Sequence, residues 1–250
     1  MTFDVAAEAY DRFMGRYSVQ LAPQLAELGG VEAGQRVLDV GCGPGALTGE
    51  LVRRLGAGAV AAVDPSDPFV AAAKARHPGV EVQRASAERL PFDDGTFDAA
   101  LAQLVVHFMA DPVAGLREMA RVTRPGGVVA ACVWDHAGDR TPLAVFWRAA
   151  HELDPGTQGE SALAGAREGH LAELLAEAGL TSVEEATLEF ASFEDWWEPF
   201  TLGVGPAGAY VGTLDDAPRG LLRERCDELL GAPPFTVSSV AWAARGLVDR

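Results

Sequence analysis

Between residues 31 and 133 the chain alternates short, nearly uninterrupted apolar runs with longer amphipathic stretches. The apolar runs have the length of buried strands and end in turn-forming residues, a pattern typical of a parallel sheet. The stretches between them carry apolar residues at helical spacing and end at glycine or proline. The pattern predicts strands at residues 36–40, 60–63, 80–84, 97–102 and 128–134, with helices between them.

This alternation predicts the architecture as well as its elements. Parallel strands joined by helices need crossover connections, which place helices on both faces of the sheet. Such sheets bind ligands outside the carboxyl ends of their strands. We therefore expect an α/β fold whose chemistry lies in the loops after Val40, Val63, Arg84 and Ala102.

The last hundred residues are less regular. They contain an aromatic stretch at residues 193–200 and a glycine-rich stretch at residues 203–212, which predicts a loop. The other elements expected here are helices at residues 171–178 and 221–230, a strand at residues 186–190 and a late strand at residues 235–242.

Composition and charge narrow the possible partners. Of 250 residues, 48% are hydrophobic and 22% charged, which is typical of a folded domain. Acidic residues outnumber basic ones by 36 to 20, so the positive surface needed to bind nucleic acid is not expected. The three cysteines fit neither a disulfide framework nor a zinc site. Without an evident leader or membrane-spanning run, we expect a cytoplasmic protein that holds no metal.

A glycine-rich loop, residues 41–45, lies where the first strand passes into a helix. Alone it is a weak signal, because several kinds of nucleoside site use such turns. Asp39, beside it, would repel a pyrophosphate and attract an ammonium or sulfonium group. Asp64, after the next strand, can accept hydrogen bonds from ribose hydroxyls. Together these residues favour a positively charged nucleoside without phosphate, and S-adenosylmethionine fits that description.

Three segments resemble a known family. Residues 37–45 resemble motif I of class I S-adenosylmethionine-dependent methyltransferases. Residues 90–98 and 124–127 resemble later landmarks of the type 11 subfamily, which includes ubiquinone/menaquinone-biosynthesis-like methyltransferases. The resemblance covers about residues 4–135. It implies a Rossmann-like, seven-stranded, mostly parallel sheet with an antiparallel last strand, helices on both faces and a helical, aromatic lid.

We expect one methyltransferase domain over residues 1–250, divided by the resemblance into four parts. Residues 1–30 form an N-terminal helical cap, and residues 31–135 form the cofactor-binding core. Residues 136–165 and 191–232 form a substrate-side insert or lid. Residues 180–190 and 235–243 supply the last strands, of which the final one is the candidate antiparallel strand.

The resemblance also implies the cofactor contacts. Backbone atoms of the glycine loop would approach the methionine part, Asp39 its ammonium group, and Asp64 the ribose. The implied set is Tyr10, Arg16, Asp39, Gly41, Cys42, Gly43, Gly45, Asp64, Pro65, Ser66, Ser86, Ala87, Glu88 and Gln103.

Two members of this set need comment. Ser86 stands where the family usually has an aspartate that pairs with the adenine amino group, so that contact loses its charge. Arg16 could pair with the methionine carboxylate, because a guanidinium matches carboxylate geometry. Alternatively, the segment around Arg16 is an ordinary amphipathic helix with solvated arginines.

On the acceptor side, His107 follows the fourth strand and is the candidate catalytic base, since a histidine can take a proton near neutral pH. A lone histidine is also commonly structural. We expect an apolar wall or lid from Trp134, Trp196, Trp197 and Phe200, or packing of the insert onto the sheet. Tyr210 and residues 203–212 could gate the site. Apolar lining suggests a small hydrophobic or amphipathic acceptor.

Three functions compete. The first is methyl transfer to a small molecule, by O- or C-methylation of a hydrophobic metabolite. The second is a nicotinamide-dependent oxidoreductase, disfavoured by Asp39, by the glycine spacing and by the lack of a Tyr-x-x-x-Lys pair, since Lys74 is the only lysine. The third is a protein that binds S-adenosylmethionine without catalysis, which Ser86 leaves open.

Overall fold

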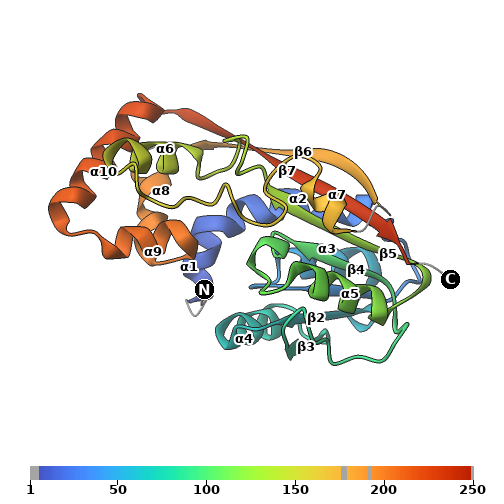
Figure 1. Cartoon of the computed structure of the whole chain (residues 1–250). Helices are drawn as coiled ribbons and strands as arrows, with labels where there is room; N and C mark the ends of the chain where they lie inside the picture. Colours follow the sequence, from blue (N-terminus) through green and yellow to red (C-terminus); the bar gives the residue numbers. More distant parts are fainter. Residues whose placement is uncertain (1–5, 176–178, 191–192, 249–250) are drawn as a thin grey trace.

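A computed structural model describes residues 6–175, 179–190 and 193–248. In this part of the chain one seven-stranded sheet has the order β3-β2-β1-β4-β5-β7-β6. In Figure 1 the sheet fills the right-hand part of the view, with β6 and β7 along its upper edge. The strands are β1 (Val37–Val40), β2 (Val60–Asp64), β3 (Glu81–Arg84), β4 (Phe97–Gln103), β5 (Thr123–Trp134), β6 (Gly179–Phe190) and β7 (Phe235–Leu247).

The strand directions confirm the mostly parallel sheet. The pairs β3–β2, β2–β1, β1–β4 and β4–β5 are all parallel. The last strand, β7, runs antiparallel to both of its neighbours, β5 and β6. The prediction that the late strand would be antiparallel is therefore confirmed, and β7 continues beyond the predicted end, to Leu247.

Helices cover both faces of the sheet, as the alternation predicts. Helices α2 (Arg16–Leu28), α3 (Ala46–Leu55) and α4 (Asp67–Arg76) pack on one face, and α5 (Pro112–Val122) and α7 (His170–Leu174) on the other. Neighbouring residues of β2 point to opposite faces, because side chains alternate along a strand. Ala62 accordingly packs with α4, whereas Ala61 belongs to the cluster under α5.

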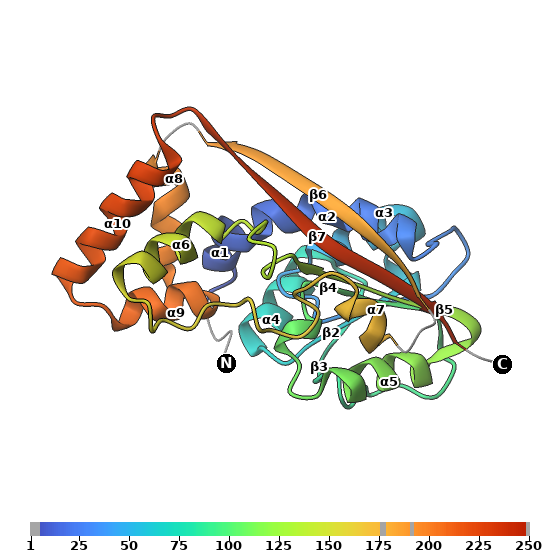
Figure 2. The same ribbon diagram turned by 45° about the horizontal axis from the view of Figure 1, so that its top comes forward.

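The remaining helices form an arm at one end of the long β6–β7 pair (Figures 1 and 2). This helical arm consists of α6 (Ala144–Leu153), α8 (Phe193–Trp197), the 3-10 helix η4 (Glu198–Leu202), α9 (Gly205–Thr213) and α10 (Asp216–Leu230). Before the sheet, the chain forms α1 (Ala7–Tyr10) and a π-helical turn, η1 (Asp11–Gly15), which leads into α2. Figure 2 shows α1 beside the arm.

Two regions differ from the prediction. The expected loop at residues 203–212 is wrong, because α9 occupies most of it. Its glycines are compatible with a helix here because Ala207, Gly208 and Val211 are buried within the arm, and tertiary packing outweighs weak helix propensity. Of the expected helix at residues 171–178, the structure describes α7, whereas residues 176–178 lie outside the described part.

Among the described residues, no helix combines the length and apolarity that crossing a bilayer requires.

Candidate functional site

A cavity of about 440 Å³ opens at the carboxyl ends of β1, β2 and β4. A second cavity of about 300 Å³ continues past the glycine loop and shares Tyr10, Gly41 and Gln103 with the first. The predicted cofactor residues on the larger cavity are Tyr10, Gly41, Gly43, Asp64, Pro65, Ser66, Ser86, Ala87, Glu88 and Gln103. Asp39, Cys42 and Gly45 line the smaller one. We call these two connected spaces the cofactor cavity.

The glycine loop needs its glycines for two different reasons. Gly41 has a φ of 71°, and a Cβ built on it would lie 2.5 Å from Cγ2 of Val105. Gly45 has a φ of 102° and faces His77, whose Nε2 lies 2.9 Å from the Gly45 carbonyl oxygen. Gly43 differs, because a Cβ there would meet only Tyr10 at 3.9 Å. Backbone close packing thus accounts for Gly41 and Gly45, whereas Gly43 faces open space in the cavity.

Asp64 joins this loop to the start of α4. One of its carboxylate oxygens accepts from the Gly43 amide and the other from the Ser66 amide, both at 2.8 Å. Burial raises the pKa of Asp64, against the opposing effect of these two hydrogen bonds. Each carboxylate oxygen has a second lone pair, so the side chain can accept further hydrogen bonds from a ligand in the cavity. Ser66 also caps α4, accepting from the Phe69 amide.

Two acceptor oxygens on the smaller part of the cavity lack a donor. Asp39 accepts from the Thr48 hydroxyl through Oδ2 at 2.6 Å, but its buried Oδ1 has no partner among the described residues. Gln103 donates to the Ser18 carbonyl, while its buried Oε1 is likewise without a donor in the described chain. Burial raises the pKa of Asp39 to about 7. Buried acceptors are costly unless paired, so this corner suits a ligand with several N–H donors and positive charge.

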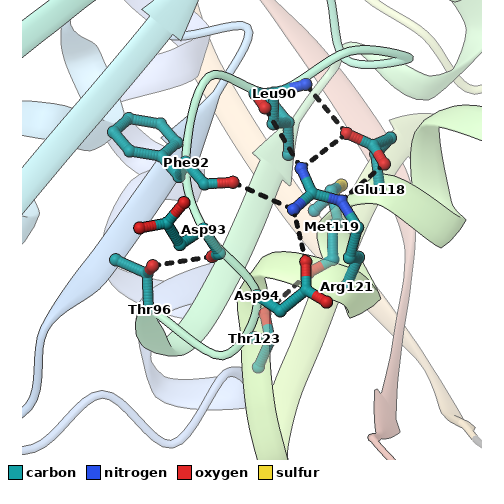
Figure 3. Close-up of polar contacts among 9 residues, drawn as sticks. All are labelled: Leu90, Phe92, Asp93, Asp94, Thr96, Glu118, Met119, Arg121 and Thr123. Atoms are coloured by element: carbon teal, nitrogen blue, oxygen red, sulfur yellow. Dashed lines mark hydrogen bonds and ion pairs between the residues drawn. The ribbon is translucent and has the colours of Figure 1, made fainter.

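The opposite wall comes from the connection between β3 and β4. Ser86, Ala87 and Glu88 lie on the cavity, and Glu88 accepts from the Ala110 amide at 2.8 Å. The rest of this connection is attached to α5 through Arg121, as Figure 3 shows. The Arg121 guanidinium pairs with Glu118 and Asp94 and donates to the carbonyls of Leu90 and Phe92. The residues that resemble a type 11 landmark therefore stabilise the loop rather than contact the cavity.

The N-terminal segment closes one side of the cavity through Tyr10, whose ring meets Phe69 edge to face at 5.2 Å. Asp11 pairs with Arg76, which also donates to the Pro44 carbonyl, so the segment is tied to the glycine loop. Arg16 does not line the cofactor cavity. Its guanidinium lies 3.6 Å from the Asp195 carboxylate of the arm. The arm packs against this side of the N-terminal helix, so Arg16 has a partner other than the one expected.

A small cavity of about 30 Å³ adjoins the cofactor cavity, and both are lined by Tyr10, Leu104 and Phe108. We call it the acceptor chamber. His107 lines it from the turn after β4 and is 6% exposed, and its Nδ1 lacks a partner in the described structure. Burial, with a smaller effect of His136, lowers the pKa of His107 well below its usual value. Burial thus favours the neutral form of His107.

Two ionisable residues of this chamber, His136 and Glu160, were not among the predicted site residues. His136, which follows β5, is 7% exposed, and burial lowers its pKa to about 4. Burial raises the pKa of Glu160 to about 7, and its Oε2 accepts from the Trp147 indole at 2.7 Å. The position of His136 just after a strand was a usable signal. Glu160 lies in an irregular segment, where the sequence carries no such signal.

The aromatic residues predicted on the acceptor side divide into two groups. Trp134 lines the chamber and donates its indole N–H to the Met14 sulfur at 3.2 Å. Trp196, Trp197 and Phe200 do not line the cofactor cavity or the chamber. They are buried in one cluster, in which Phe200 stacks on Phe146 at 4.7 Å. Of the two roles considered for them, this placement supports packing.

Tyr210 also points into the arm. Its hydroxyl accepts from Thr157 at 3.3 Å, and its ring lies 6.0 Å from that of Trp147. It lies on α9, which occupies the segment expected to be a gating loop.

No group of three or more histidine, cysteine or acidic side chains suited to a metal ion occurs among the described residues.

Comparison with known proteins agrees with this geometry. Residues 38–131 match a family profile described as a methyltransferase domain. The UbiE ubiquinone/menaquinone biosynthesis C-methyltransferase of Bdellovibrio bacteriovorus is 36% identical over 110 residues, 42% of this chain and 47% of the relative. A malonyl-[acyl-carrier protein] O-methyltransferase of Erwinia billingiae is 35% identical over 127 residues, 51% of this chain and 49% of the relative. The chain thus spans about half the length of these relatives.

Solved structures extend the likeness of the fold over nearly the whole chain. The YcgJ protein of Bacillus subtilis covers 94% of this chain and 99% of its own, with a TM-score of 0.57 and 19% identity. The [4+2]-cyclase SpnF covers 93% of this chain and 81% of its own, with a TM-score of 0.56 and 23% identity. At such identities these likenesses show the fold alone.

Proposed function

We propose that this chain transfers the methyl group of S-adenosylmethionine to a small-molecule acceptor, a function supported by the match of residues 38–131 to a methyltransferase-domain profile. The main support comes from two buried oxygens, on Asp39 and Gln103, that accept no hydrogen bond from the described residues. They lie next to the glycine loop, whose Gly43 amide donates to Asp64. The cofactor's ammonium supplies the N–H donors and positive charge that this corner lacks. Its ribose hydroxyls fit the remaining acceptor capacity of Asp64.

The residues present fit the rest of the cofactor as well. Tyr10, Phe69 and Met109 give the larger cavity apolar surface, while Ser86 and Glu88 add polar groups on the wall after β3. We place the adenine between this wall and the start of α4, at Pro65 and Ser66. Arg16 is left out of the contact set because of its pairing with Asp195.

When bound, S-adenosylmethionine supplies a methyl carbon already activated by the sulfonium, so this chain's residues have three tasks. They align the acceptor for in-line attack, exclude water and receive a proton where the acceptor carries one. Tyr10, Leu104 and Phe108 stand between the cofactor cavity and the acceptor chamber. His107, on the far side, is the candidate proton acceptor.

For the acceptor, we propose a hydrophobic metabolite methylated on oxygen or carbon. The relatives named above act, by name, as a C-methyltransferase and an O-methyltransferase, and the acceptor chamber is bounded by Phe13, Met14, Trp134 and Leu143. We expect no nucleic-acid partner, because the net charge of −16 repels phosphate backbones. A nicotinamide dinucleotide fits less well, since the unpaired Asp39 oxygen would face its pyrophosphate.

Calorimetric titration with S-adenosylmethionine, S-adenosylhomocysteine and NADH tests this proposal. Micromolar binding of the two sulfur nucleosides alone is expected. Asp64→Asn should weaken it at least tenfold, because the amide cannot accept from both backbone amides and the ribose. The matched control is Asp227→Asn, an exposed position on α10, which should bind like the wild type. Preference for NADH, or an Asp64→Asn variant with unchanged affinity, would refute the cofactor assignment.

A further inference from the structure

Three ionisable side chains from separate segments meet at the acceptor chamber. His107 comes from the turn η3 (Val106–Phe108), His136 from the residues after β5, and Glu160 from the connection after α6. The rest of the lining is mostly apolar and includes residues of η1, of the end of β5 and of the start of α9. A cluster of this kind is uncommon in an apolar core, where unpaired polar groups are destabilising.

The imidazoles are incompletely paired. Nδ1 of His107 and both ring nitrogens of His136 are buried and have no hydrogen-bond partner within the described chain. The two ring centroids lie 5.8 Å apart. A neutral imidazole offers one donor and one acceptor, so the two rings present a matched set of both kinds. Glu160 differs, since the Trp147 indole already donates to it.

The size of the chamber limits what can enter. About 30 Å³ is room for one or two water molecules, and thus for one small polar group of a larger molecule. A hydroxyl group both donates and accepts, and so can pair with two neutral imidazoles. An ammonium group would offer donors only and would bring an unscreened charge beside rings that stay neutral.

We propose that the acceptor chamber binds the hydroxyl end of the methyl acceptor, with His136 as a specificity-determining residue and His107 Nδ1 as the proton acceptor. This inference rests on the proposed methyltransferase function. In the reaction the hydroxyl oxygen forms the new bond to the methyl carbon as the carbon–sulfur bond breaks. The bonding pair passes to sulfur, and the hydroxyl proton passes to His107 and then to solvent.

The weak basicity of the two imidazoles narrows the kind of hydroxyl group that can react in the chamber. An imidazole is a much weaker base than an alkoxide, so it takes a proton more readily from an acidic hydroxyl than from an aliphatic alcohol, and burial lowers the pKa of both rings further. A phenol or enol hydroxyl is several orders of magnitude more acidic and can transfer its proton as the methyl bond forms. The chamber is therefore suited to an acidic hydroxyl on an otherwise apolar molecule.

The test uses the chain saturated with S-adenosylhomocysteine and three probes of equal size: 4-ethylphenol, 4-ethylaniline and 4-ethyltoluene. Calorimetric titration should show 4-ethylphenol binding about tenfold more tightly than either of the others, since its hydroxyl both donates and accepts well, whereas an aniline nitrogen is a poor acceptor and a methyl group does neither. His136→Leu should abolish this preference, and His136→Gln should restore part of it. His151→Gln, an exposed histidine on α6, should leave it unchanged.

The possible outcomes distinguish failure of the chamber assignment from failure of the proposed methyltransferase function. Failure of S-adenosylhomocysteine to bind the wild-type chain would overturn the proposed function itself. Normal binding of that nucleoside with equal affinity for the three probes would overturn the chamber assignment alone. A phenol preference that survives in His136→Leu would remove His136 from the site. If His136→Leu does not fold, the wild-type preference and the His136→Gln variant still decide the question.

Discussion

The cofactor cavity and the acceptor chamber lie next to each other but are built differently. The cofactor cavity is formed mainly by loops that follow successive strands, from Asp39 to Gln103. The acceptor chamber takes its lining from segments as far apart as Phe13, His107, Glu160 and Pro206. A site made by consecutive strand ends follows from topology, whereas a site made by distant segments depends on how the arm packs.

The electrostatics differ in the same way. The cofactor cavity holds buried carboxylates and favours a cation, whereas the chamber holds imidazoles that burial keeps neutral. Substitutions in one region should therefore leave the other nearly intact. The following predictions test that independence, in order of decreasing effect.

The largest effect on stability should come from the arm. Phe200→Ala removes a buried ring stacked on Phe146 and should lower the free energy of unfolding by about 3–5 kcal/mol. Cofactor affinity, measured below the unfolding transition, should change less than twofold. Denaturant unfolding and calorimetry measure the two quantities. Leu221→Ala, an exposed residue of α10, is the control and should cost little. Loss of cofactor binding in the folded Phe200→Ala variant would show that the regions are coupled.

The next effect concerns the glycine loop. Gly41→Ala places a methyl group 2.5 Å from Val105 at a φ of 71°, so we expect destabilisation of about 2 kcal/mol or more and at least a tenfold loss of cofactor affinity. Gly58→Ala is the matched control, since a Cβ there meets nothing within 4 Å. Unchanged S-adenosylhomocysteine binding in Gly41→Ala would contradict the close packing assigned to this loop.

Asp39→Asn should act through pH. Because burial raises the pKa of Asp39 to about 7, the folded chain holds a proton that the unfolded chain loses near pH 4. The Asp39 contribution to the free energy of unfolding therefore falls as pH rises from about 4 to about 7. The stability of Asp39→Asn minus that of the wild type should increase over this window, by up to a few kcal/mol. Parallel unfolding curves for the two proteins would refute this.

The same substitution should affect the cofactor in the opposite sense. The ammonium group favours the charged carboxylate, so wild-type affinity for S-adenosylhomocysteine should increase as pH rises through about 7. In Asp39→Asn we expect this pH dependence to disappear and affinity at pH 8 to fall about tenfold. Calorimetry between pH 6 and 8 measures both. A pH-dependent affinity that persists in the variant would point to another group.

The smallest effect should come from Arg16→Gln. Its guanidinium pairs with exposed Asp195 and lies outside the cofactor cavity, so cofactor affinity should stay within twofold of the wild type. Arg12→Gln, which removes the neighbouring pair with Glu198, is the matched control. A tenfold weaker affinity in Arg16→Gln alone would restore the methionine-carboxylate role implied by the family resemblance.

Much of the core could be predicted because its signals are local. Strand β1 is a short, mainly apolar run followed directly by the glycine loop, and the Ser66 cap and the Asp111 cap stand where α4 and α5 begin. Parallel strands must place their carboxyl ends together, so Asp39 and Asp64 were bound to lie near one another. The methyltransferase resemblance, confirmed for residues 38–131, follows from the same local motifs.

The arm and the chamber could not be predicted in this way, because their residues meet only through packing. The glycines of residues 203–212 indicated a loop, yet packing within the arm makes most of this segment helical. Arg16 was expected to contact the cofactor, but in the structure its guanidinium pairs with Asp195, a residue of the arm. His136 and Glu160 lie far apart in sequence, and only the tertiary structure brings them to one cavity. The sequence by itself thus determined the sheet and the nucleoside-binding loops, through local patterns and strand topology. The lining of the acceptor side was decided by long-range packing, which no local pattern encodes.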